Sequence, residues 1–144
     1  MNRHAWAASI CLGLAPALAP AQDAMGIDEI GKQEYMAACA GCHGESGKGD
    51  GPIAQLIEIQ TPDLTTIRQR MEMADDDFPY RNTLMLIDGR NAIRAHGSDM
   101  PVWGERYSSR GIGHWFRGPD AETRELAALG RMLALVYYIE SIQE

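Results

Sequence analysis

The residues best suited to chemistry lie together in the run Cys39-Ala40-Gly41-Cys42-His43. A C-x-x-C-H run is the attachment signal of a c-type haem: each cysteine forms a thioether to one haem vinyl group, and the histidine ligates the iron. Two intervening residues let both sulfurs reach one porphyrin edge within a single helical turn. The same C-x-x-C spacing occurs in redox dithiols and in zinc sites, so the motif alone leaves three interpretations.

The surrounding sequence favours haem over the other two interpretations. A redox dithiol of the thioredoxin type belongs to a βαβ unit, and no strand pattern surrounds Cys39 and Cys42. A zinc site needs about four ligands, usually from two clusters, and the only other cysteine is Cys11 near the N-terminus. One haem c, attached through Cys39 and Cys42, explains both cysteines and the adjacent His43.

The opposite face of the iron needs a second ligand, and its type decides the function. Methionine there raises the reduction potential and favours electron transfer, whereas a vacant position allows ligand binding or catalysis. We expect Met100, because it precedes the rigid Pro101 in a segment without helical periodicity. His96, in the same segment, is the main rival. The remaining candidates are methionines expected to serve packing or to lie at the surface: Met71, Met73 and Met85.

The first residues are typical of an export signal. A short basic start precedes an apolar, uncharged stretch over residues 5–18, and small side chains follow at Ala19 and Ala21. This apolar stretch is shorter than the roughly 20 residues of a membrane-spanning helix. We therefore expect 1–21 to be a cleaved signal peptide and 22–144 to be a single periplasmic domain, with its core at about 27–144 and no transmembrane span remaining.

The charge balance bears on the class of partner. The chain has 13 basic and 20 acidic residues, a formal net charge of −7. Cleavage after Ala21 would remove Arg3 and no acid, which leaves 12 basic against 20 acidic residues and a charge of −8. This argues against nucleic acid as a partner. It is compatible with docking onto a basic patch of a redox protein, although acidity that serves solubility explains it equally well.

Helices and loops must bring the candidate residues together. The spacing of Ile27, Ile30, Tyr35 and Ala38 predicts a helix over 27–38 that leads into the cysteines. Asp120 is a suitable N-cap for a last helix, which places these apolar residues at helical spacing: Leu126, Leu129, Leu133, Val136 and Tyr137. No stretch alternates as a strand does. The predicted fold class is therefore all-α, with short helices and long loops ordered around the cofactor.

The middle of the chain is expected to be mostly loops with short helices between them. Four glycines over 44–52 predict a loop. Short helices are expected over 53–59, 64–70 and 80–87, with Gly89 ending the last of them. Residues 90–107 show no clear period. Ser108–Pro119, which carries His114, Trp115 and Phe116, is expected to be a further glycine-rich loop.

Three separated features make the chain resemble class I c-type cytochromes over nearly all of 22–144. Gly31-x-x-x-Tyr35-x-x-x-Cys39 resembles the N-terminal helix of that family. Met100-Pro101 with Trp103-Gly104 resembles the methionine-ligand loop of small bacterial members. Leu135-x-x-Tyr138-Ile139 resembles the C-terminal helix, whose aromatic residue packs on the N-terminal glycine. The resemblance implies the cytochrome c fold, with the first and last helices packed together and one covalently bound haem.

The resemblance also implies roles for single residues. Pro52 lies nine residues after His43, as in compact members of the family, where the proline carbonyl accepts the bond from the histidine Nδ1–H. Trp103 is expected to contact the haem. Further candidates for haem packing or propionate hydrogen bonds are Tyr107, Arg90 and Arg94.

The expected function is periplasmic electron transfer by a single haem with axial His43 and Met100. The expected partners are redox proteins that donate and accept the electron, and the protein would be a monomer or a subunit of a redox complex. No acid–base or nucleophilic constellation stands out, so we expect a carrier rather than an enzyme. The alternatives are a haem enzyme, which needs a vacant or displaceable distal site, and a haem-binding subunit or sensor module of a larger complex.

Overall fold

The computed structural model describes residues 25–74, 77–91, 100–110 and 120–144. These residues form helices joined by irregular segments, with no strand among them. The all-α prediction is therefore confirmed for the part of the chain described. The helices are α1 (Ile27–Ala38), α2 (Ala40–His43), α3 (Pro52–Leu56), α4 (Ile67–Arg70), α5 (Tyr80–Asp88), α6 (Trp103–Arg110) and α7 (Ala121–Ser141).

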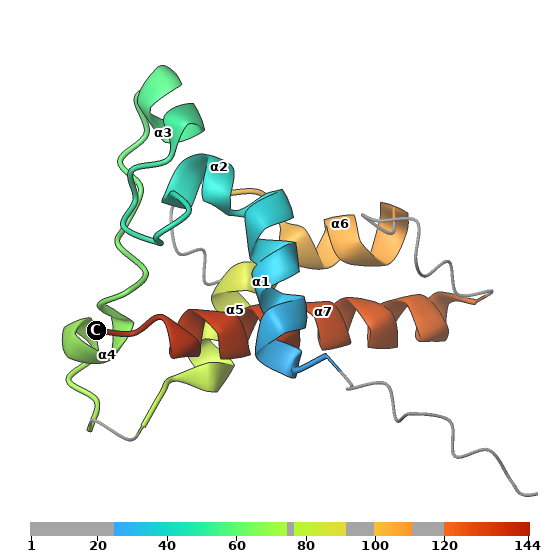
Figure 1. The fold of residues 1–144 in the computed structure, drawn as a ribbon. Helices are drawn as coiled ribbons and strands as arrows, with labels where there is room; N and C mark the ends of the chain where they lie inside the picture. The colour runs from blue at the N-terminus through green and yellow to red at the C-terminus, as the bar shows by residue number, and fades with distance from the viewer. Residues whose placement is uncertain (1–24, 75–76, 92–99, 111–119) are drawn as a thin grey trace, which may run out of the picture.

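The first and last helices cross and form the largest helix–helix contact of the fold (Figure 1). They meet at Gly31, where a side chain would collide with the backbone carbonyl of Ala134 and come within 2.8 Å of the Tyr138 Cβ. Beside this crossing the rings of Tyr35 and Tyr138 lie 5.0 Å apart. The predicted contact between the C-terminal aromatic residue and the N-terminal glycine is confirmed.

Several helix boundaries agree with the sequence, but two do not: the helix predicted over 53–59 is Pro52–Leu56, and the helix predicted over 64–70 is Ile67–Arg70. The α1 bounds are those predicted, Asp120 accepts a bond from the Thr123 N–H as the N-cap of α7, and Gly89 ends α5 at φ 67°. Of the apolar residues whose spacing predicted α1, Tyr35 is buried beside Gly31, whereas Ile27 and Ile30 are exposed.

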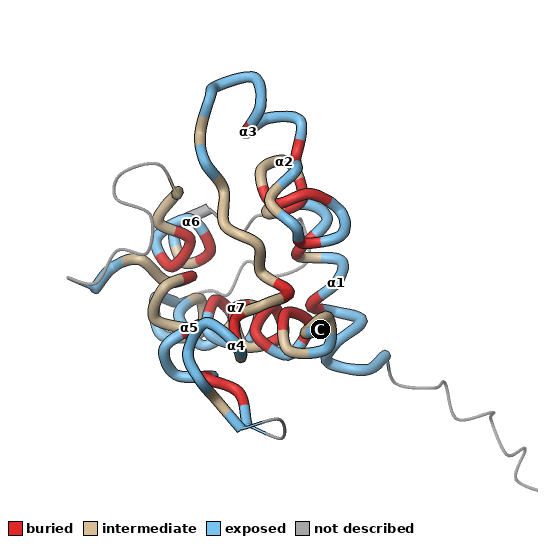
Figure 2. Tube along the Cα trace, turned by 90° about the vertical axis from the view of Figure 1, so that its left-hand side faces the viewer, coloured by how far each residue is buried: buried red, intermediate tan, exposed pale blue. Residues whose placement is uncertain are grey.

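The last helix also turns an unexpected face to the core. The apolar side chains at 126, 129 and 137 are exposed. The buried side of α7 consists of Ala128, Met132, Ala134, Leu135, Val136, Tyr138 and Ile139. Figure 2 shows buried segments on this helix alternating with exposed ones. The predicted apolar residues and the buried residues of α7 form two overlapping faces. The face that contains the small side chain of Ala134 is the buried one, because a small side chain there lets α1 approach closely.

The predicted loop over Ser108–Pro119 is wrong in its first three residues, because α6 extends through Arg110. Trp103 and Tyr107, one helical turn apart, are both buried in the core with their rings 5.8 Å apart. The sequence of α6 is mostly polar, and its helix propensity alone does not predict a helix. The burial of the two aromatic rings stabilises the helix through tertiary packing. The predictions for residues 1–24, Arg94, His96, His114, Trp115 and Phe116 fall outside the described residues.

Candidate functional site

The C-x-x-C-H run forms the tight junction between α1 and α2. Cys39 ends α1 and begins α2, and its carbonyl accepts bonds from the N–H groups of Cys42 and His43 at 3.1 and 2.9 Å. Both thiols are free, and both line the same cavity, together with His43. One short helical turn therefore presents all three side chains on one side of the backbone.

The glycine-rich loop completes the end of α2. It has no helix or strand over 44–51, as predicted, but Pro52, the last residue of the predicted loop, begins α3. The N–H groups of Gly49 and Gly51 donate to the carbonyls of His43 and Cys42 at 2.8 and 3.1 Å. Gly49 adopts φ +81°, and a Cβ there would lie 3.3 Å from the carbonyl carbon of Pro62 and closer still to the Thr61 carbonyl. A glycine at this position lets the chain around residues 61–62 pack directly beside His43.

This packing sets the hydrogen bond of the histidine. His43 Nδ1 lies 3.3 Å from the carbonyl oxygen of Pro62. A carbonyl can only accept, so Nδ1 carries the proton and Nε2 keeps the lone pair that a metal requires. The prediction that Pro52 supplies this carbonyl is wrong: Pro52 is exposed at the start of α3, and it lines neither of the cavities next to His43.

Two mostly apolar cavities lie against the histidine. Their volumes are about 310 and 380 Å³. They share four lining residues: Cys39, His43, Pro62 and Met100. Met100 is half-buried and packs against the core. The structure thus brings Met100, 57 positions further along the chain, to the same space as the two cysteines and His43.

Of the residues expected to contact the haem, Trp103 lies next to the first cavity beside His43. Trp103 is buried and lines the first cavity with Arg106. Tyr107 lines neither cavity, and the guanidinium of Arg90 is bound to Asp88 and Glu125. These positions do not support the suggested haem contacts of Tyr107 and Arg90. Met71 lines the second cavity, whereas Met73 and Met85 line neither.

The residues present fit a c-type haem. Two thiols, an imidazole and a thioether converge on space with mostly apolar walls, which suits a flat apolar ring and its iron. Thr61 Oγ1, at the edge of the first cavity, is buried and makes no hydrogen bond with any described residue. A bound group with polar substituents would satisfy this oxygen. No cluster of three or more His, Cys, Asp or Glu side chains suited to a metal ion occurs among the described residues.

The model of the cytochrome c family matches residues 29–127. The chain belongs to the cytochrome c family. Searches of curated proteins and of solved structures give no match. Membership implies covalently bound haem c, haem-based electron transfer and redox partner proteins, and members of the family typically carry electrons.

The Cys39 thiol of this cytochrome is poorly suited to the rival dithiol chemistry. Burial, with smaller contributions from the nearby charges of Glu34 and Cys42, raises the pKa of Cys39 to about 12. A redox-active cysteine instead needs a lowered pKa, because the thiolate is the nucleophile. The environment of Cys39 therefore favours a structural or cofactor-linking role over thiol exchange.

Several residues of this cytochrome site could not be found by pattern alone. Pro62, Thr61 and Arg106 approach His43 or the first cavity only through folding, and no local motif marks them. Ile53 and Ile57 line the same cavity although both are largely exposed. Across the described ranges, no helix has both the length and the apolar character needed to cross a membrane.

Proposed function

We propose that the protein is an exported one-electron carrier with a single haem c, held by thioethers to Cys39 and Cys42 and by axial His43 and Met100. The observation that carries this proposal is the shared lining of the two cavities, which includes both His43 and Met100. A bound haem would supply the Fe(II)/Fe(III) couple. Methionine as the second ligand favours a high potential and electron transfer.

The chain's own residues perform the supporting tasks. The Pro62 carbonyl orients the His43 ring and fixes the proton on Nδ1, so the imidazole keeps the same position in both oxidation states. Apolar walls, including Trp103, exclude water from the site. A rigid, dry site lowers the reorganisation that accompanies a change of charge, which is the property a carrier needs.

Export to the periplasm is the second part of the proposal. It rests on the basic start, the apolar stretch and the small residues before position 22. The net charge of −8 that cleavage after Ala21 would leave supports docking onto a basic face of the redox partner. The mass of the purified protein tests the export signal: residues 22–144 with one haem are expected, and a mass that includes residues 1–21 contradicts cleavage.

The ligand assignment is tested by Met100→Ala, with Met71→Ala as the matched control. Met71 is a second methionine beside the same space, since it lines the second cavity with His43 and Met100. We expect Met100→Ala to abolish the far-red sulfur-to-iron band of the ferric protein and to lower the midpoint potential, while Met71→Ala leaves both in place. The assignment fails if Met100→Ala keeps the band, and Met71 becomes the ligand if its variant alone loses it.

Carbon monoxide distinguishes a carrier from a sensor or enzyme. With both axial positions filled, the ferrous wild-type protein is expected not to bind carbon monoxide at neutral pH, and Met100→Ala is expected to bind it. Rapid and tight binding by the wild-type protein would indicate a displaceable ligand and would favour the sensor or enzyme alternative.

A further inference from the structure

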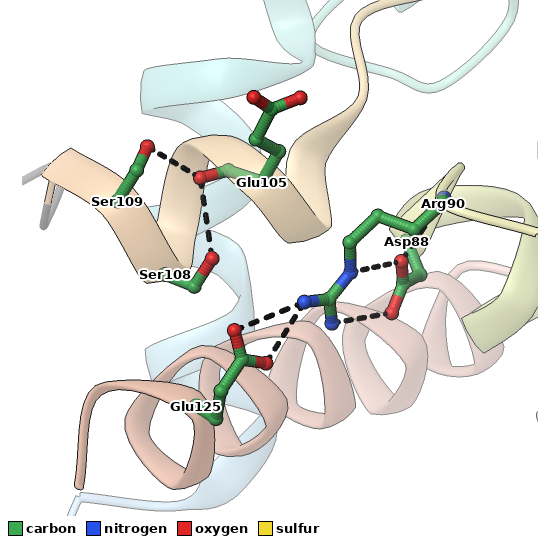
Figure 3. Close-up of polar contacts among 6 residues, drawn as sticks. All are labelled: Asp88, Arg90, Glu105, Ser108, Ser109 and Glu125. Carbon is green, nitrogen blue, oxygen red and sulfur yellow. Dashed lines mark hydrogen bonds and ion pairs between the residues drawn. The ribbon is translucent and has the colours of Figure 1, made fainter. Parts of the chain in front are cut away.

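A cluster of ion pairs joins the end of α5 to α7, and α6 lies beside it (Figure 3). Arg90, just after α5, uses all three guanidinium nitrogens. Nε and Nη2 donate to the two carboxylate oxygens of Asp88 at 2.7 and 2.9 Å, and Nη1 donates to both oxygens of Glu125 on α7 at 2.8 and 3.0 Å. The Arg90 N–H also donates to Asp88 Oδ1 at 3.1 Å. One side chain thus ties the end of α5 to the first turns of α7.

The third helix, α6, lies directly on this cluster. A Cβ at Gly104 would lie 2.5 Å from Arg90 Nε and 2.8 Å from Asp88 Cγ. Gly104 is buried and lies in the first turn of α6. A helical backbone suits any residue, so close approach to the ion pair is the reason for a glycine at this position.

A second contact closes the same junction. Gly89, the left-handed residue that ends α5, lies against Val102, with a Cβ there 3.4 Å from the Val102 Cα. Residues 88–90 therefore contact residues 102–104, and these two short stretches flank the segment that carries Met100. The chain has only Pro101 and Val102 between Met100 and the start of α6, so the placement of α6 sets the placement of Met100.

We propose that the Asp88–Arg90–Glu125 cluster, with Gly104 packed on it, is the positioning device that holds Met100 toward His43. This inference rests on the proposed function, in which Met100 is the second axial ligand. Exposed ion pairs contribute little to global stability, and about two-fifths of the Arg90 side chain is exposed (38%). The cluster instead fixes a position. The bonds to Asp88 on one side and to Glu125 on the other hold the Arg90 guanidinium in one orientation, and Gly104 of α6 packs against it.

Arg90→Gln tests the proposal, with Arg81→Gln as the matched control. Arg81 is exposed in the first turn of α5, so its replacement removes the same charge from the same region without touching α6. The readouts are the far-red methionine–iron band of the ferric holoprotein, the pH at which that band is lost, and the rate at which cyanide displaces the methionine. Helix content and the urea midpoint are recorded for each variant.

For Arg90→Gln we expect full haem attachment, a urea midpoint close to that of the wild type, and a weaker band. The band should be lost about one pH unit lower and cyanide should bind about tenfold faster, the changes that correspond to roughly 1.4 kcal/mol less restraint on the ligand. Arg81→Gln should match the wild type. Equal behaviour of Arg90→Gln and Arg81→Gln would overturn the proposal.

Two further variants keep the test decisive if Arg90→Gln does not fold. Glu125→Gln retains one accepting oxygen and removes one charge, and Gly104→Ala pushes α6 away from the cluster while every charge stays. Both are expected to shift the band and the cyanide rate in the same direction as Arg90→Gln. If neither does, the proposal fails. A wild-type protein that lacks the band refutes the Met100 ligand itself, whereas a normal wild-type band with unchanged variants refutes only the positioning role.

Discussion

Gly31→Ala should destabilise this cytochrome although alanine is the better helix former. The exchange removes the penalty of about 1 kcal/mol that glycine carries inside a helix. Against this gain, the new methyl group would lie 2.6 Å from the carbonyl carbon of Ala134, where ordinary contacts begin at 3.4 Å. The methyl group would lie closer still to the Ala134 carbonyl oxygen, so the two helices would have to separate by more than the 0.8 Å (3.4 minus 2.6) that the carbonyl carbon alone demands. A backbone carbonyl cannot rotate away as a side chain can.

The size of the effect follows from this separation. Overpacking a well-filled site costs roughly 1–3 kcal/mol, and a gap of 0.5–1 Å forfeits about a quarter to a half of the dispersion energy of the contacts it opens. Gly31 lies at the centre of the largest helix contact, next to the fully buried Tyr35. We therefore place the cost at about 3 kcal/mol, which leaves a net loss of about 2 kcal/mol after the helix-propensity gain.

Gly130→Ala provides the matched control. Gly130 lies within α7, and a Cβ there meets nothing within 4 Å in the described structure. The same exchange should then stabilise the protein by roughly 0.5–1 kcal/mol, because only the helix-propensity term remains. Urea unfolding of the ferric holoproteins, followed by circular dichroism, gives both free-energy differences. Changes of the same sign at Gly31 and Gly130 would refute the close-approach argument.

Three other predictions concern polar contacts. Tyr35→Phe removes the buried hydroxyl that donates at 2.7 Å to the carbonyl of Gly44, the residue that caps α2. The free energy of unfolding in urea should fall by about 1–3 kcal/mol. An unchanged free energy would mean that the carbonyl finds another donor. Arg131→Met keeps the aliphatic stem but breaks the two 2.7 Å bonds to Glu34. The free energy of unfolding should fall by about 2 kcal/mol, and adding Glu34→Gln should restore most of it. If the second substitution restores nothing, the two residues are not energetically coupled and the prediction is wrong. The hydrogen bonds from Arg90 hold the pKa of Asp88 below its usual value. Ionised Asp88 therefore adds a small stabilisation above about pH 4, in keeping with a partly exposed ion pair, and this contribution disappears as the pH falls through the folded-state pKa. The small stability difference between wild type and Asp88→Asn, measured against pH, should shrink on acidification, and a constant difference would contradict the ion-pair account.

The features that depend on neighbouring residues could be predicted from the sequence. The C-x-x-C-H chemistry, the glycine-rich loop after it, the bounds of α1, the Asp120 cap and the Gly89 stop all follow from residue types within one or two helical turns. Such features are set by backbone conformational preference and short hydrogen bonds, which a pattern of residues records directly.

Which distant groups meet depends on how the helices and loops pack, and local sequence patterns do not record this. The periodicity of apolar residues predicted the helices but not their buried faces. Helix α7 carries apolar residues on several sides, and the side that is buried is the one that contacts Gly31 of α1. The carbonyl beside His43 belongs to Pro62 rather than Pro52, because the close approach allowed by Gly49 brings that stretch of backbone to the ring. Local sequence specifies what each segment can form, and close packing between segments far apart in the chain decides which atoms face one another.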